Sequence, residues 1–131
     1  MKKTSLTQLL DIKYPVIMAP MFLVTNTKMM IEAMNSGIAG CIPALNYRND
    51  NLFREAIQEI RANTSSKGLG INLIVNKSNI KMQQQLKTCV ELEVDFIITS
   101  LGSPKQVIEE CKPKGIKVFC DVVEEKYAVK V

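Results

Sequence analysis

Five short apolar runs, each followed by an amphipathic segment, constrain the fold of this chain more than any other feature. Within each run Val, Ile, Leu and Ala follow one another almost without a break, which is typical of parallel strands covered by helices. The runs are VIMAP from Val16, IAGCIPA from Ile38, LGINLIV from Leu69, VDFIITSLG from Val94 and IKVFCDV from Ile116. This alternation predicts an α/β fold with right-handed crossovers.

The segments between the runs carry the boundary signals of helices. Asn26 and Asp50 can each cap a helix, and Ser103 followed by Pro104 marks the start of another. A short leading helix is expected in SLTQLLDI, ahead of the first run. The helix after Asp50 has an apolar stripe, which consists of Leu52, Phe53, Ala56, Ile57 and Ile60.

Two architectures fit five βα units. Strand starts recur about every 20–30 residues, close to the spacing in a (β/α)8 TIM-type barrel of about 250 residues. We predict that residues 1–131 are a single N-terminal portion of such a barrel, namely its first five βα units, and therefore an incomplete barrel. A five-stranded doubly wound parallel sheet is the alternative. An incomplete barrel has open sheet edges, so self-association through them is expected.

Composition narrows the class of protein. Apolar residues make up 47% and charged residues 23% of the 131 residues, as in a core-forming globular protein. The net charge of +4 is spread along the chain and aromatics make up only 5%, which argues against a nucleic-acid partner. No apolar run approaches the ~20 residues of a membrane span, and no signal peptide is visible. We therefore expect a cytoplasmic protein with no membrane partner.

The sequence also argues against a metal site. It has no histidine, and its four cysteines form no closely spaced pair. Small buried thiols in a reducing compartment are the favoured interpretation. Cys41 as a nucleophile is the alternative, although no base for it is visible.

Ligands bind at the carboxyl ends of the strands in both architectures. These ends present Ala19-Pro20-Met21, Gly40 to Ala44, Asn72, Thr99 to Gly102, and Asp121. No Ser/His/Asp set, pair of carboxylates, Walker A loop or GxGxxG motif is found there, which argues against hydrolytic chemistry. Small and neutral ends instead suit a flat cofactor that performs the chemistry itself on a small-molecule substrate.

Two of these ends raise specific hypotheses. Pro20 interrupts strand pairing, which would leave the backbone groups of Ala19 and Met21 for a ligand, with the Met21 thioether against a planar ring. Alternatively, Pro20 only ends a strand. Asn72 lies inside an apolar run, where an unpaired amide costs ~1–3 kcal/mol. It is either a structural amide or a partner for the edge of a heteroaromatic ring.

Taken together, these segments resemble the nitronate monooxygenase (2-nitropropane dioxygenase) family and its relatives, the flavin-dependent enoyl-acyl-carrier-protein reductases. The resemblance covers nearly the whole chain. It is carried, in order, by YPVIMAPM, AMNSGIAGCIPA, NLFREAIQEIRANTSSKGLGINLIV, VDFIITSLGSP and GIKVFCDV. Family members similarly show a P-[IV]-[IV]-x-A-P-M opening, a Gly-rich second strand and a G-[VI]-N-[LI] third strand.

The resemblance implies an FMN-binding (β/α)8 barrel that oxidises alkyl nitronates with O2. An enoyl-acyl-carrier-protein reductase, or a non-catalytic half-barrel for binding or assembly, are the alternatives. By the resemblance, Ala19, Pro20 and Met21 would lie along the flavin, and Asn72 would form a hydrogen bond with it. Ser100 and Gly102 would line the same mouth.

Two departures from the family pattern limit this expectation. Phe22-Leu23 stand where relatives often carry small glycine-rich residues. The family's catalytic histidine lies in an AGGH-type motif beyond the fifth unit, and its phosphate-binding loops come later still. We therefore expect no catalytic residue within this chain, weak flavin binding at most by the chain alone, and no turnover.

Overall fold

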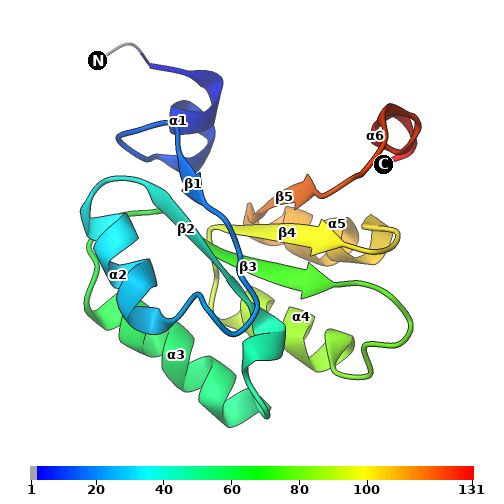
Figure 1. Ribbon diagram of the computed structural model, residues 1–131, viewed down its shortest axis with the longest axis horizontal. Coiled ribbons are helices and arrows are strands. Elements are labelled where there is room, and N and C mark those ends of the chain that lie inside the picture. The colour runs from blue at the N-terminus through cyan, green and yellow to red at the C-terminus, as the bar shows by residue number, and fades with distance from the viewer. Residues whose placement is uncertain (1–2) are drawn as a thin grey trace.

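The computed structural model describes residues 3–131 as a five-stranded sheet with most of its helices on one face (Figure 1). The strands are β1 (Ile17–Met18), β2 (Ala39–Pro43), β3 (Leu69–Ile74), β4 (Phe96–Ser100) and β5 (Lys117–Cys120). The helices are α1 (Ser5–Leu10), α2 (Thr27–Asn35), α3 (Asp50–Ala62), α4 (Met82–Glu91), α5 (Lys105–Cys111) and α6 (Glu125–Lys130). Two short 3-10 helices are η1 (Ala44–Asn46) and η2 (Lys112–Lys114).

The order of the strands decides between the two predicted architectures. All neighbouring pairs are parallel, and the strands lie side by side in their order along the chain, from β1 to β5. A doubly wound sheet reverses its strand order at a switch point, whereas a barrel adds each strand on the same side. The chain therefore forms five consecutive βα units of a half-barrel, as predicted, and the doubly wound alternative is wrong.

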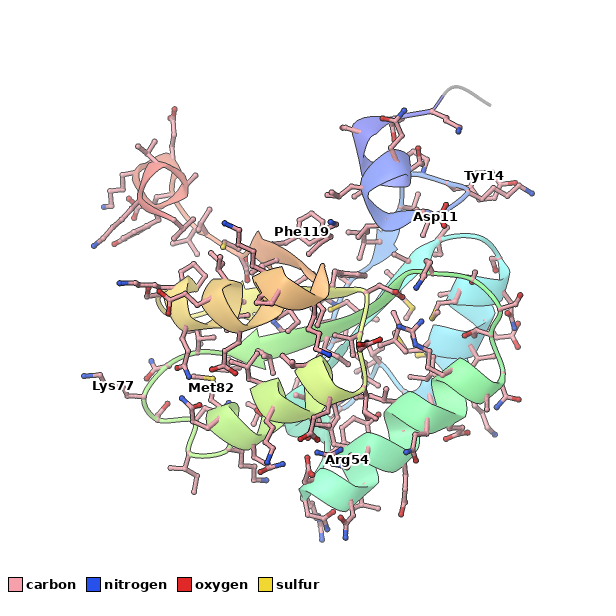
Figure 2. All side chains as sticks on the ribbon, turned by 180° about the vertical axis from the view of Figure 1, so that it is seen from behind. Asp11, Tyr14, Arg54, Lys77, Met82 and Phe119 are labelled. Carbon is pink, nitrogen blue, oxygen red and sulfur yellow. The ribbon has the colours of Figure 1, made fainter. Side chains whose placement is uncertain are left out.

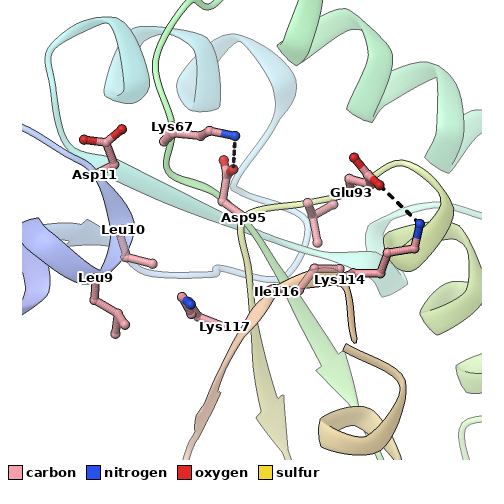
Figure 3. Close-up of a pocket in the computed structure, with 11 residues that line it drawn as sticks. Leu9, Leu10, Asp11, Lys67, Glu93, Asp95, Lys114, Ile116 and Lys117 are labelled. Atoms are coloured by element: carbon pink, nitrogen blue, oxygen red, sulfur yellow. Dashed lines mark hydrogen bonds and ion pairs between the residues drawn. The ribbon is translucent and has the colours of Figure 1, made fainter. Parts of the chain in front are cut away.

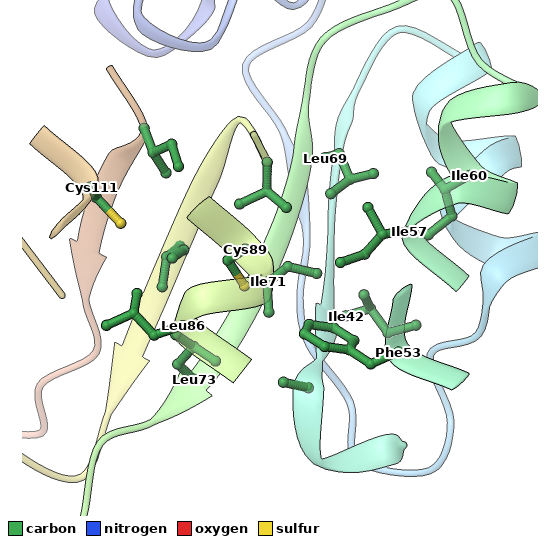
Figure 4. Packing of buried hydrophobic residues seen from close by; sticks show 14 of the residues in the cluster. Ile42, Phe53, Ile57, Ile60, Leu69, Ile71, Leu73, Leu86, Cys89 and Cys111 are labelled. Carbon is green, nitrogen blue, oxygen red and sulfur yellow. The ribbon is translucent and has the colours of Figure 1, made fainter. Parts of the chain in front are cut away.

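The outer face of the sheet holds the main core. Alternate residues of β3, namely Leu69, Ile71 and Leu73, are fully buried against the helices. Figure 4 shows Ile57 of α3 and Leu86 of α4 on these strands. Each fully buried side chain of this size contributes roughly 1.5–3 kcal/mol relative to leaving it exposed, so this layer stabilises the arrangement of the strand ends.

The inner face, which would line the interior of a closed barrel, holds a smaller core. Leu10 and Ile12, from α1 and the segment after it, pack there with Cys41 and Phe96. Phe96 also meets Phe119 edge to face, with ring centroids 5.6 Å apart. Figure 2 shows Phe119 on the side of the sheet that carries α1. The leading helix therefore plugs the amino-terminal end of the half-barrel and leaves the carboxyl ends of the strands uncovered.

The structure departs from the sequence-based expectation at the sheet edge. The apolar run at β5 suggests burial on both faces, yet Lys117 is exposed and the other residues of β5 are only half-buried. The cause is position, since β5 is the edge strand and pairs with β4 alone. No helix within residues 3–131 is long and apolar enough to cross a membrane.

The helix starts are close to those predicted, although α5 has Pro104 rather than Ser103 in the cap position. Asn26 caps α2, as predicted, by accepting a hydrogen bond from the Met29 amide. The cap of α3 is Asn49 rather than Asp50, which instead pairs with Arg54 one turn on. Leu52 was predicted in the apolar stripe but is 45% exposed, because its position turns away from the sheet.

Candidate functional site at the carboxyl ends of the strands

Two of the predicted site residues meet on the inner face. Asn72 of β3 and Ser100 of β4 are each only 9% exposed, and the Asn72 side-chain Nδ2 donates to the Ser100 Oγ over 2.9 Å. The same Nδ2 donates to the Ile98 carbonyl oxygen over 3.0 Å. Asn72 therefore bonds neighbouring backbone, as its structural interpretation requires.

The oxygen of the same side-chain amide, Asn72 Oδ1, remains available as an acceptor. No described residue donates a hydrogen bond to Asn72 Oδ1, yet no buried side-chain oxygen or nitrogen within residues 3–131 lacks a partner. The Oδ1 atom must therefore keep contact with solvent. An otherwise buried amide with one accessible acceptor can bind a ligand and support the sheet at the same time.

Asp121 joins this pair, although it was predicted only as a strand-end residue and not as part of the site. Ser100 Oγ donates to Asp121 Oδ2 over 3.4 Å, which gives a polar chain across β3, β4 and the end of β5. Thr99 accepts the Asp121 backbone N–H over 2.9 Å, so the pairing of the two strands continues to this residue. The signal in the sequence was the lone acid after an apolar run.

The first strand end differs from its prediction. Thr25 occupies the backbone groups that Pro20 was expected to leave for a ligand. Its Oγ1 accepts from the Met21 amide over 3.0 Å and donates to the Ala19 carbonyl over 3.4 Å, while Met21 O accepts from the Thr25 and Val24 amides. The backbone is engaged because residues after Pro20 close a tight turn. A ligand at this turn would therefore contact its side chains and not its backbone groups.

The side chains of this turn are apolar and exposed. Met21 is 38%, Phe22 62%, Leu23 72% and Val24 57% exposed. Asn46 after β2 holds the turn in place, accepting from the Leu23 amide and donating to the Thr25 carbonyl, each over 2.9 Å. This turn is held by hydrogen bonds and exposes apolar side chains at a strand end, where they can pack against the face of a planar ligand.

The strand register relates β1, which leads into this turn, to the strand that carries Asn72. Met18 pairs with Gly40, and Pro43 pairs with Asn72. β1 therefore lies two strands from β3, or roughly 10 Å at the usual strand spacing, and Met21 follows it by three residues. The joint contact of Met21 and Asn72 with one ligand stays a prediction.

Gly102 lies by a cavity of about 500 Å³ between the β4–α5 loop and α6. Asp121 and Tyr127 line it on the other side. A Cβ on Gly102 would come within 3.0 Å of the Val75 carbonyl oxygen, so glycine permits a close approach of the loops after β3 and β4. This is the largest of the described cavities at the strand ends.

Cys41 does not serve as a nucleophile here. It is fully buried on the inner face, and burial raises the pKa of its thiol well above the ordinary value. Because the thiolate is the reactive form, the alternative hypothesis for Cys41 is wrong.

A second cavity, of about 240 Å³, lies at the amino ends of the strands (Figure 3). Four of its charged side chains form ion pairs: Lys67 with Asp95 over 3.5 Å and Lys114 with Glu93 over 3.3 Å. In barrels this end serves stability, whereas ligands bind at the other. The cavity is therefore a poorer candidate than the carboxyl ends.

Comparisons with known proteins found relatives among solved structures. No protein-family model and no curated protein sequence matches the chain. FabK from Thermotoga maritima matches with a TM-score of 0.89 and 28% identity, over 99% of this chain and 40% of that one. A mutant of the same FabK matches equally well, over 43% of its length. The chain is thus similar to part of FabK and spans less than half the length of either match.

Proposed function

We propose that this chain is the flavin-ring-binding portion of an FMN-dependent oxidoreductase of the enoyl-acyl-carrier-protein reductase type. The observation that carries the proposal is the match of nearly the whole chain to FabK, a flavin-dependent enoyl-acyl-carrier-protein reductase. The sequence resemblance stated above supports the same class. Nitronate oxidation, the first expectation from the sequence, becomes the second candidate, because the structural match lies on the reductase side.

The residues at the strand ends fit a flavin ring. Asn72 offers one accessible acceptor, and the turn at Met21 offers apolar side chains. In this proposal Ala19, Pro20 and Met21 lie along the ring, Asn72 bonds its edge, and Ser100 and Gly102 border the mouth. A bound flavin supplies the redox chemistry, whereas the chain binds and orients the ring and excludes water from one side.

We expect the isolated chain to bind the ring weakly and to gain nothing from the phosphate. Lumiflavin, which is the ring without ribityl phosphate, should bind with a Kd of about 1 mM, and FMN should bind within about threefold of it. The reason is that the candidate site consists of neutral and apolar side chains. Titration followed by amide chemical shifts measures both affinities and shows whether residues 19–21, 72, 100 and 102 respond.

A matched variant makes this titration decisive. Met21→Ala removes the thioether from the turn and should weaken lumiflavin binding severalfold, whereas Ile80→Ala, at an exposed position (92%) before α4, should not. Submicromolar FMN binding, or shifts confined to the amino ends of the strands, would contradict the proposal. The two candidate reactions are separated by two assays of a complete barrel that contains this chain. One measures enoyl reduction driven by NAD(P)H, and the other measures nitronate oxidation.

The open sheet edges lead to a further proposal, that the chain self-associates. Strands β1 and β5 each pair on one side only, and exposed apolar residues such as Leu101 and Val123 lie near the strand ends. Unpaired edges and apolar patches favour association. Sedimentation velocity between about 10 and 500 μM should show a concentration-dependent rise in mass; a strictly monomeric species would contradict this.

A further inference from the structure

We propose that Ser100 and Asp121 are positioning residues that lock the side-chain amide of Asn72, so that this position accepts a hydrogen bond from a ligand and cannot donate one. The inference rests on the proposed function for the identity of the ligand. The lock itself rests on geometry alone.

The direction of each hydrogen bond in the chain is fixed. The Ile98 carbonyl oxygen can only accept, so the Asn72 atom 3.0 Å from it must be the nitrogen. The second proton on that nitrogen points to Ser100 Oγ, 2.9 Å away. Both N–H groups of Asn72 are therefore used inside the protein.

Asp121 fixes the direction of the hydrogen bond between Asn72 and Ser100. The Ser100 hydroxyl has a single proton, which it donates to Asp121 Oδ2 over 3.4 Å. With its proton engaged, Ser100 can only accept from Asn72. If the amide flipped, its oxygen would face the Ile98 carbonyl at 3.0 Å and Ser100 could no longer donate to it without leaving Asp121. A carbonyl facing a carbonyl is unfavourable, so the chain of bonds selects one orientation.

The outward atom is then Asn72 Oδ1, on a residue that is only 9% exposed. Across the sheet Asn72 pairs with Ile98 of β4, which in turn pairs with Phe119 of β5, and both partners are apolar residues of the inner face. A ligand that lies here must bring an N–H group to the oxygen or leave a nearly buried acceptor unpaired, at a cost of ~1–3 kcal/mol. The ligand class is a planar ring whose edge carries an imide-type N–H, and a ring with that nitrogen methylated is discriminated against.

The lock is tested first without any ligand, by hydrogen exchange of the Asn72 side-chain NH2 in the full chain labelled with nitrogen-15. Ser100→Ala and Asp121→Ala should each speed this exchange about tenfold, the effect of losing one hydrogen bond. Asp121→Asn and Ser100→Thr keep an acceptor and a hydroxyl, respectively, and should restore slow exchange. Glu124→Ala removes a nearby exposed carboxylate whose partner is Lys126, and should change nothing.

Asp121 is exposed, so we expect its variants to fold even if Ser100→Ala does not. Exchange unchanged in Asp121→Ala would overturn the proposal. Exchange equally fast in Asp121→Asn and Asp121→Ala would also overturn it, because an amide oxygen accepts the same bond from Ser100.

The donor requirement is tested next with lumiflavin and 3-methyllumiflavin. The wild-type chain should bind lumiflavin about tenfold more tightly. Asp121→Ala should reduce this ratio to about threefold or less, because Ser100 without its acceptor can donate to the amide oxygen and so offset part of the cost of a turned amide. A ratio unchanged by Asp121→Ala would mean that the methyl group acts only by its bulk, and would overturn the donor requirement. If neither ring binds while the exchange results hold, the proposed function fails and the lock stands.

Discussion

Asp95→Ala is expected to lower the free energy of unfolding by about 3 kcal/mol, because it leaves several donors without an acceptor at once. The Asp95 carboxylate accepts from the backbone amides of Gly68 and Leu69, over 2.9 and 2.8 Å. It also pairs with the Arg61 guanidinium over 3.0 Å. With its side chain only 9% exposed, Asp95 joins the start of β4 to the start of β3 and to the last turn of α3.

Urea unfolding followed by circular dichroism measures this loss. Asp95→Asn keeps one oxygen for the two amides and loses the charge facing Arg61, so it should cost about half as much. Lys126→Ala breaks an exposed ion pair with Glu124 of 2.6 Å and should cost less than about 0.5 kcal/mol. An Asp95→Ala midpoint equal to that of Lys126→Ala would show that the carboxylate does not anchor the strands.

The apolar runs predicted the strands, and the spacing between them favoured a half-barrel, although only the observed strand order excluded a doubly wound sheet. All five runs contain the observed strands, and the helix cap at Asn26 is where the sequence indicated. This succeeded because continuous apolar runs and cap residues are local signals. The cap of α3 was placed one residue late, since Asn49 and Asp50 are both good caps and only the backbone conformation distinguishes them.

The site was less predictable because its contacts are between strands. Asn72 and Ser100 were candidates one by one, yet their bond depends on the register of β3 against β4, which pairs Ile74 with Ser100. The occupation of the Met21 backbone by Thr25 depends on a turn geometry that the sequence does not specify. Strand register and loop conformation are tertiary properties, and no local pattern encodes them.

Gly70 is a further case of a role that only tertiary packing reveals. In the sequence it is one of two glycines in GLGIN that lead into the third run. In the structure it lies on the inner face of β3 opposite Phe96 in register, and a Cβ there would overlap the Phe96 ring. Phe96 is fully buried and meets Phe119 edge to face, so its ring can make room for a Cβ only by displacing its neighbours.

Gly70→Ala is therefore expected to destabilise the chain by about 3 kcal/mol through overpacking, measured as above. Gly40→Ala is the matched control: it lies in the neighbouring strand, but its Cβ would meet the end of the flexible Met30 side chain at 2.7 Å, so it should cost about 1 kcal/mol. Replacing Phe96 by a smaller side chain tests this cause directly. In a Phe96→Leu background the loss of unfolding free energy caused by Gly70→Ala should fall by at least about 1 kcal/mol. If the loss stays the same, its cause is the backbone of β3 and not the Phe96 ring inside the half-barrel.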